Sequence, residues 1–157
     1  MMRYIITESQ YKTVIEQLDF SKKVDYSDLN AKEKEEYNFA KITSRLADYG
    51  YRTFREPNDW SGADFYCIGR HCDLGKSIKI QQKGRLTFDK KYMGKNIYIA
   101  FNDKKDDTYY LYPHDELLRE LLDLGYFVGT SSWDEKGGYS IGKISPKIRA
   151  ILEPYKF

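Results

Sequence analysis

The stretch that decides the fold is Gly62-Ala63-Asp64-Phe65, followed seventeen positions after its aspartate by Gln81-Gln82-Lys83-Gly84-Arg85. Apolar and polar residues alternate over residues 78–85, which is typical of a strand with two different faces. Residues 62–68 alternate in the same way, so a strand is expected there as well, with Asp64 near its start. The two strands are expected to pair through a turn at residues 69–76.

This pairing would bring three polar side chains together. Gln81 and Lys83 share one face of their strand, and Asp64 would lie beside them. A divalent cation bound by carboxylate and carbonyl oxygens can orient a phosphodiester and lower the pKa of a bound water, while a nearby lysine positions or deprotonates that water. The alternative interpretation is a solvated strand face with polar residues at every second position, because short motifs of this kind often arise by chance.

The order of the neighbouring segments adds to this pattern. A helix is expected to end at Asp48-Tyr49-Gly50-Tyr51, and it is followed by an extended segment at residues 52–56, the approach to Asp64 at residues 59–64, the Gln81-x-Lys83 strand and an apolar strand at residues 97–101. Over roughly residues 30–118 this order resembles the helix-strand-strand-strand core of the PD-(D/E)xK nuclease superfamily, in particular Holliday-junction resolvases and Mrr-type restriction nucleases.

The resemblance implies roles for three residues. Asp64 corresponds to the aspartate of the motif, Gln81 to its acidic position and Lys83 to its lysine. Asp64 and Gln81 would then bind Mg²⁺ or Mn²⁺. Gln81 supplies a neutral oxygen where most members have a carboxylate, a substitution that resembles the Mrr-type variant and that should weaken metal binding.

Many members of the superfamily also carry a glutamate on the first helix, about three turns before the glycine that ends it. The corresponding region of this chain is Glu35-Glu36-Tyr37-Asn38-Phe39. Asn38 is the first candidate for this catalytic position and Glu36 the second. If Asn38 occupies it, Asp64 is the only carboxylate of the site.

The charge distribution near this site is compatible with a nucleic-acid partner. The net charge is only +2, but residues 76–95 hold seven basic residues against Asp89 alone. Phosphate contacts by such residues would give salt-sensitive binding with little sequence preference. The nucleic-acid-binding candidates are Lys79, Arg85, Lys90, Lys91, Lys95 and Trp60. The alternative is that the lysines only keep a strand edge from aggregating, and that Trp60 covers the edge of the sheet.

Composition limits the remaining possibilities. A chain of 157 residues with 41% hydrophobic residues is long enough for one domain with a buried core. No apolar run approaches the roughly 20 residues that span a bilayer, so no membrane association is expected. Two cysteines do not make a disulfide framework and no secretory signal is visible, which favours a cytoplasmic location.

We therefore expect a single α/β domain over residues 1–157, with a restriction-endonuclease-like mixed sheet of about four or five strands flanked by helices. Residues 1–28 would form an N-terminal accessory strand and helix. Residues 30–124 would form the core, with helices at 30–49 and 114–124 and a charged loop at 87–95. Residues 125–157 would form a C-terminal hairpin and a short helix.

The expected function is metal-dependent hydrolysis of DNA phosphodiester bonds, with branched and single-stranded DNA among the candidate substrates. A homodimer would suit cleavage of both strands. The main alternative is a catalytically silent module of the same fold that binds nucleic acid or a protein partner. A small interaction protein with no nucleic-acid role is a third hypothesis.

Overall fold

The computed structural model describes residues 7–10, 12, 21–58, 62–70 and 77–157. Contacts divide the chain into two units, Met1–Lys34 and Glu35–Phe157, and each is described by itself. Within the described ranges, no helix has both the length and the apolar character needed to cross a membrane.

The first unit shows two reciprocal helix caps. The Gln10 side chain accepts a hydrogen bond from the Thr7 N–H (2.9 Å), and the Thr7 hydroxyl accepts one from the Gln10 N–H (3.3 Å), which is a capping box. Most of the accessory strand and helix expected at residues 1–28 lies outside the described residues. A short 3₁₀ helix, η1 (Tyr26–Asp28), follows, and Asn30 and Glu33 form a second capping box at the start of α2 (Ala31–Asp48).

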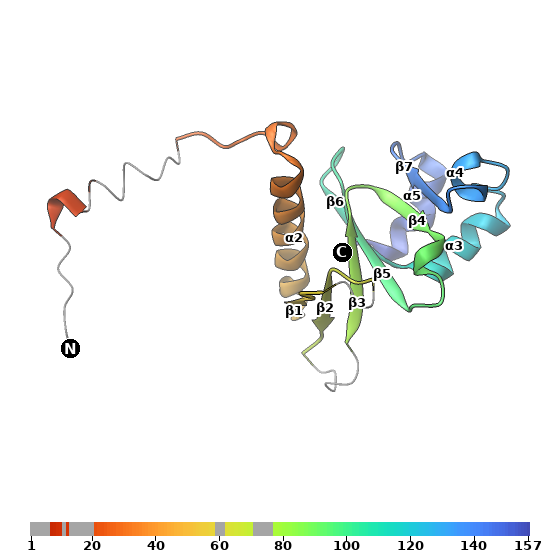
Figure 1. The fold of residues 1–157 in the computed structure, drawn as a ribbon, viewed down its shortest axis with the longest axis horizontal. Helices are drawn as coiled ribbons and strands as arrows, with labels where there is room; N and C mark the ends of the chain where they lie inside the picture. The colour runs from red at the N-terminus through yellow and green to blue at the C-terminus, as the bar shows by residue number, and fades with distance from the viewer. Residues whose placement is uncertain (1–6, 11, 13–20, 59–61, 71–76) are drawn as a thin grey trace. The chain divides into compact units, whose positions relative to one another are not determined.

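The second unit contains a five-stranded mixed sheet in the order β1-β2-β3-β5-β6 (Figure 1). Its strands are β1 (Arg52–Arg55), β2 (Phe65–Ile68), β3 (Ile78–Lys83), β5 (Ile97–Asp103) and β6 (Thr108–Pro113). β3 and β5 are parallel, and the other neighbours are antiparallel. The expected mixed α/β class is confirmed, and β5 lies next to the central strand, as its nearly continuous apolarity predicts.

Helices cover both faces of this sheet (Figure 1). On one face, Ile42 and Leu46 of α2 pack against the buried side chains of β2, β3 and β5. α2 ends where Gly50 adopts a φ of +79° and the Tyr51 N–H donates to the Leu46 carbonyl (3.1 Å). The other face is covered by α3 (His114–Asp123) and α5 (Pro146–Leu152), which share a second apolar core with β5 and β6.

The connection from β3 to β5 is not the loop expected at residues 87–95. It contains strand β4 (Leu86–Asp89) and the 3₁₀ helix η2 (Lys90–Tyr92). Leu86 and Phe88 are fully buried and alternate with half-buried Thr87 and Asp89. The strand is only four residues long and has basic residues on both sides in the sequence. Its alternation of apolar and polar residues is therefore too short to be recognised from the sequence.

The C-terminal segment also differs from expectation. Residues 125–157 form no local hairpin but α4 (Ser131–Asp134), strand β7 (Gly138–Ile141), α5 and η3 (Glu153–Tyr155). β7 pairs antiparallel with β4 in a separate two-stranded sheet. The partner of β7 lies some fifty residues earlier in the chain, so a pattern of neighbouring residues cannot identify it.

Two buried side chains attach β4 to the main sheet. The Tyr112 hydroxyl donates to the Thr87 carbonyl (2.6 Å) and accepts from the Thr87 N–H (3.2 Å). Burial raises the pKa of Tyr112, so its hydroxyl keeps the proton that it donates. The His114 Nε2 atom accepts from the Asp89 N–H (3.2 Å), and its Nδ1–H therefore donates to the Asp115 carboxylate (2.7 Å). These hydrogen bonds anchor the connection between β3 and β5, which carries most of the basic residues of the stretch 76–95.

We expect a Tyr112→Phe variant to lose about 1–3 kcal/mol of unfolding free energy, because two backbone groups of Thr87 lose their buried partner. Urea denaturation would measure the loss. The control is Tyr110→Phe, whose hydroxyl is 3.5 Å from Arg149 and should matter less. Equal losses in the two variants would contradict the proposed attachment of β4.

Candidate functional site

The backbone at Asp64 is fixed from both sides. The Asp64 N–H donates to the Ile80 carbonyl of β3 (2.9 Å), and its carbonyl accepts from the Glu56 N–H just after β1 (3.1 Å). β2 begins at the next residue, where Phe65 pairs with Ile80. The aspartate is therefore held between the two strands that flank β2 as it enters the sheet.

The structure brings Asp64 and Gln81 together. The Asp64 Oδ2 atom accepts one hydrogen bond from the Gln81 side-chain amide (2.8 Å) and a second from the Gln82 backbone N–H (2.8 Å). Gln81 is buried, and Asp64 is half-buried. Two donors thus compensate one carboxylate oxygen for its partial loss of water.

Lys83 lies on the same face of β3 as Gln81, two positions further along the strand. Its ammonium lies 5.3 Å from the centre of the Tyr92 ring. The loop before Asp64 approaches the same ring: a Cβ atom at Gly62, whose φ is +75°, would lie 3.8 Å from Tyr92 and 3.2 Å from Ile97. Tyr92 therefore lies between the approach to Asp64 and the lysine of the motif.

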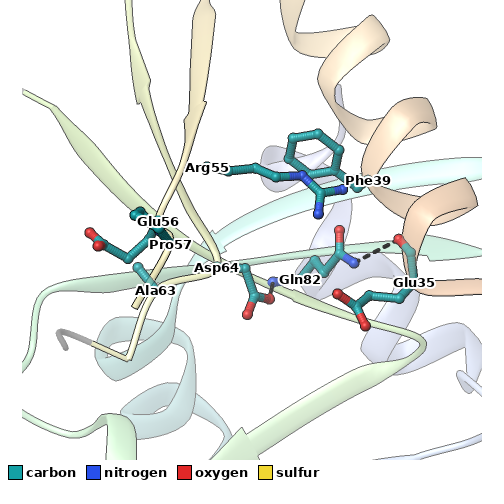
Figure 2. Close-up of a pocket in the computed structure, with 8 residues that line it drawn as sticks. All are labelled: Glu35, Phe39, Arg55, Glu56, Pro57, Ala63, Asp64 and Gln82. Carbon is teal, nitrogen blue, oxygen red and sulfur yellow. Dashed lines mark hydrogen bonds between the residues drawn. The ribbon is translucent and has the colours of Figure 1, made fainter. Parts of the chain in front are cut away.

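The helix residues are arranged differently from expectation. The Asn38 Oδ1 atom accepts from the Lys104 ammonium (2.8 Å), and Glu36 forms an ion pair with Arg55. Neither residue lines the pocket beside Asp64, whereas Glu35 does (Figure 2). Burial lowers the pKa of Lys104, as does the charge of Lys41, while Asp107 opposes them.

Glu35 could have been found from the sequence. The side chains of α2 that face the sheet are Phe39, Ile42 and Leu46, with the spacing of one helical stripe. Extending this stripe by one turn toward the N-terminus leads to Glu35, four residues before Phe39. Asn38 lies one position away from Phe39 and contacts the turn between β5 and β6 instead.

Figure 2 shows the side chains around the pocket. The pocket has a volume of about 220 Å³. It is lined by Glu35, Phe39, Arg55, Glu56, Pro57, Ala63, Asp64 and Gln82. The Gln82 amide donates to the Glu35 carbonyl (2.9 Å), which joins β3 to α2. The Gln82 Oε1 atom is buried and accepts no hydrogen bond within the described residues. A buried acceptor without a partner lowers stability where it stands.

The donor set of this pocket can be compared with what a divalent cation requires. The described part of the chain holds no group of three or more His, Cys, Asp or Glu side chains placed to bind a metal. Mg²⁺ usually keeps several waters and takes only one or two carboxylates together with substrate phosphate. Asp64 and Glu35 both line the pocket, and two carboxylates suit an open site of this kind better than a closed structural site.

The basic candidates lie on and around the β3–β5 connection. The Lys90 ammonium lies 5.0 Å from the Trp133 ring, and the Lys91 ammonium is 3.5 Å from the Asp89 carboxylate. Arg85 and Lys95 are exposed and Lys79 is half-buried. Trp60 lies outside the described residues. Lys83 and Gln81 do not line the pocket, so Asp64 is the residue that the predicted motif and the pocket share.

Comparison with known proteins gives little further information. No family model matches the chain, and no curated protein matches it. Among solved structures, the bacterial homing endonuclease I-Ssp6803I is similar with a TM-score of 0.45 and 13% sequence identity, covering 81% of this chain and 86% of that one. At this level, the likeness assigns no role to any residue of the chain.

A Gln81→Glu variant should be less stable than wild type without metal, by about 1–3 kcal/mol, because a second carboxylate would replace the donor to Asp64. Added Mg²⁺ should raise its melting temperature more than that of wild type, since a ligand bound by the folded state stabilises it. Thermal denaturation with and without Mg²⁺ measures both effects.

The control is Ser44→Glu, which adds the same charge at an exposed position of α2. Mg²⁺ should leave its melting temperature close to that of wild type. If Mg²⁺ stabilised the Gln81→Glu and Ser44→Glu variants equally, Asp64 and Gln81 would not share a cation.

Proposed function

We propose that this chain is a Mg²⁺- or Mn²⁺-dependent endonuclease that hydrolyses DNA phosphodiester bonds. The observation that carries the proposal is the Asp64 carboxylate, which Gln81 and Gln82 fix beside a pocket that Glu35 also lines. Lys83 ends β3, and the connection that follows carries Arg85, Lys90, Lys91 and Lys95. Carboxylates in a pocket next to basic side chains are what a metal-dependent phosphodiesterase requires.

Asp64 would hold the cation, and Gln81 would contribute its side-chain oxygen on the face of β3 that also carries Lys83. The carboxamide of Gln81 would have to turn for this, because its amide group now donates to Asp64. Glu35 would support the position of Asp64 from the pocket on the other face. We transfer the supporting role expected of Asn38 or Glu36 to Glu35. The cation would supply Lewis-acid polarisation of a phosphoryl oxygen.

Lys83 would activate the attacking water from the same face of β3. A lysine ammonium can hold a water in line with the phosphorus and offset the negative charge that develops there. The Tyr92 ring beneath its ammonium limits the directions in which this flexible side chain can point.

The basic residues would bind the DNA backbone. Arg85, Lys90, Lys91 and Lys95 are exposed on the β3–β5 connection, which Tyr112 and His114 hold against the main sheet. Phosphate contacts of this kind position a nucleic acid without reading its sequence. The substrate would be DNA, with branched and single-stranded forms among the candidates, and a homodimer would allow cleavage of both strands of a duplex.

A second candidate function is a silent nuclease-fold module that binds nucleic acid or a protein partner. The observation that favours it is the hydrogen bond from the Gln81 amide to Asp64, which puts a neutral donor where most nucleases of the resembled superfamily have a carboxylate. Such a module would keep salt-sensitive DNA binding without cleavage.

The test is a cleavage assay on supercoiled, single-stranded and branched DNA with Mg²⁺ or Mn²⁺. We expect wild type to cut, and Asp64→Ala, Glu35→Gln and Lys83→Ala to lose roughly 10²–10⁴-fold in rate, as is typical for removal of a group that acts in proton transfer or charge stabilisation. Controls are Asp48→Asn and Lys105→Ala, exposed residues outside the pocket.

Loss of cleavage in the three site variants, with folding verified by circular dichroism, would support the nuclease. Equal activity in wild type and the site variants would reject the assigned residues. If wild type cut no substrate but bound DNA with a steep salt dependence, the silent module would be the better description.

A further inference from the structure

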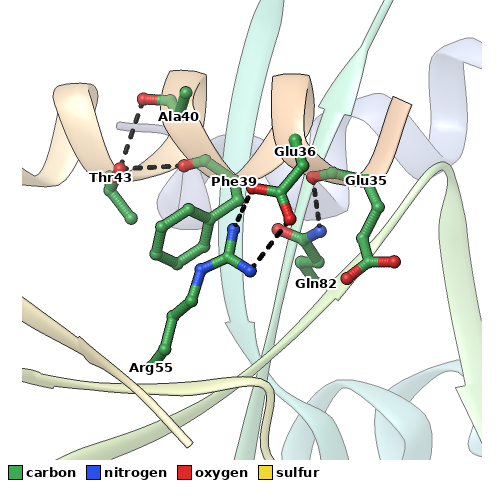
Figure 3. A network of polar contacts seen from close by, with 7 residues as sticks. All are labelled: Glu35, Glu36, Phe39, Ala40, Thr43, Arg55 and Gln82. Atoms are coloured by element: carbon green, nitrogen blue, oxygen red, sulfur yellow. Dashed lines mark hydrogen bonds and ion pairs between the residues drawn. The ribbon is translucent and has the colours of Figure 1, made fainter. Parts of the chain in front are cut away.

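Arg55, which lines the pocket, is held by two neighbours on α2 (Figure 3). Its Nη1 and Nη2 atoms donate to the two carboxylate oxygens of Glu36, at 3.1 and 2.6 Å. The guanidinium carbon lies 3.9 Å from the centre of the Phe39 ring, close enough for a cation–π contact. Arg55 is on the edge strand β1, and both neighbours are on α2.

The platform under Arg55 is itself fixed. The Phe39 ring packs edge-on against the fully buried Phe65 ring, with 5.3 Å between their centres. A planar guanidinium on such a platform loses little further freedom when it binds a ligand.

Arg55 still has donors to offer. A guanidinium has five N–H groups, and the paired oxygens of Glu36 receive two of them. The Arg55 side chain is 42% exposed, so solvent or a ligand can reach part of it. Arg149 differs, because two carboxylates, from Asp103 and Asp106, bind its two terminal nitrogens and its side chain is 29% exposed.

The charges that line the pocket make a basic side chain necessary for binding a phosphate. Among the described residues that line it, Glu35, Glu56 and Asp64 are acidic and Arg55 is basic. A phosphodiester that enters would meet three carboxylates, which repel it unless cations offset them. The planar fork of an arginine matches the oxygens of a phosphate better than any other side chain does.

We propose that Arg55 is the phosphate-binding residue of this pocket, and that Phe39 and Glu36 are positioning residues that hold its guanidinium toward a nucleic-acid backbone phosphate. The inference rests on the proposed function for the class of ligand, since it takes the phosphate from DNA. Figure 2 shows the Arg55 side chain over the same space that Asp64, Glu35 and Gln82 surround.

A purely structural role is the alternative. The ion pair between Arg55 and Glu36 joins α2 to the edge of the sheet. If it were only structural, its loss would lower the stability of the fold without changing phosphate binding. The two roles therefore differ in the salt dependence of DNA binding, which counts phosphate contacts.

The experiment measures the Kd for a short single-stranded and a short duplex DNA in Ca²⁺, over a series of salt concentrations, with uncut DNA verified on gels. We expect Arg55→Gln to weaken binding roughly tenfold or more. Its slope of log K against log salt should fall by about 0.9 on duplex and about 0.7 on single strands. Arg55→Lys should restore most of the slope and only part of the affinity, because lysine keeps the charge and loses the fork.

Arg52→Gln is the matched control, since Arg52 is an exposed arginine of the same edge strand and lies on its opposite face. It should change the Kd less than about twofold and leave the slope nearly intact. Glu36→Gln should keep the slope of wild type while weakening binding severalfold, because the charge of Arg55 remains but its orientation is lost.

The inference would be overturned if the Arg55→Gln variant had a lower melting temperature but bound DNA with the affinity and salt slope of wild type. Arg55 would then have a purely structural role. The inference would also be overturned if wild type showed no salt-dependent DNA binding.

The outcomes also separate the inference from the proposed function. If wild type bound DNA through Arg55 but cut nothing, the inference would stand while the nuclease proposal failed. If wild type cut DNA and Arg55→Gln bound and cut equally well, the inference alone would fail.

Discussion

The hydrogen bonds to the Asp64 carboxylate are the interaction on which the rest of the site depends. A half-buried carboxylate needs donors, and both come from consecutive residues of β3, the Gln81 side chain and the Gln82 backbone. The backbone of Asp64 adds a third link to β3 through Ile80. β3 is the central strand and pairs on its other side with β5, so the position of the carboxylate is tied to the middle of the sheet rather than to its edge.

The two glutamines serve different sides of this sheet. Successive side chains of a strand point to opposite faces, so Gln81 and Lys83 lie on the face of Tyr92, and Gln82 lies on the face of α2. Asp64 precedes the first residue of β2 and reaches donors of both residues. A single carboxylate can therefore connect the motif on one face with the pocket on the other, and Gln82, which no motif identifies, becomes the link between β3 and Glu35.

The elements that can be predicted from the sequence are those that depend on residues close to one another in the chain. α2, β3, β5 and α3 follow from periodic apolar residues, and the caps at Thr7 and Asn30 follow from local spacing. The pairing of Asp64 with Gln81 could be expected because a strand and its antiparallel neighbour are joined by a short connection. β4 and β7 could not be expected, because Leu86 and Phe88 reveal their burial only when distant residues form a second core over them. The helix residue of the pocket is a different case, because the apolar stripe of Phe39, Ile42 and Leu46 leads to Glu35 rather than to Asn38 or Glu36.

The polar side chains near the start of α2 make three different contacts. Successive residues of an α-helix are rotated by about 100°, so Glu35 and Glu36 cannot face the same neighbour. Glu35 lines the pocket, Glu36 binds Arg55, and Asn38 binds Lys104. The rotation of α2 is set by the apolar side chains of Ile42 and Leu46 against the sheet. The electrostatics of the pocket therefore follow from hydrophobic packing two turns away. A shift of the helix by one residue that brought Tyr37 to the position of Glu36 would leave Arg55 without its carboxylate.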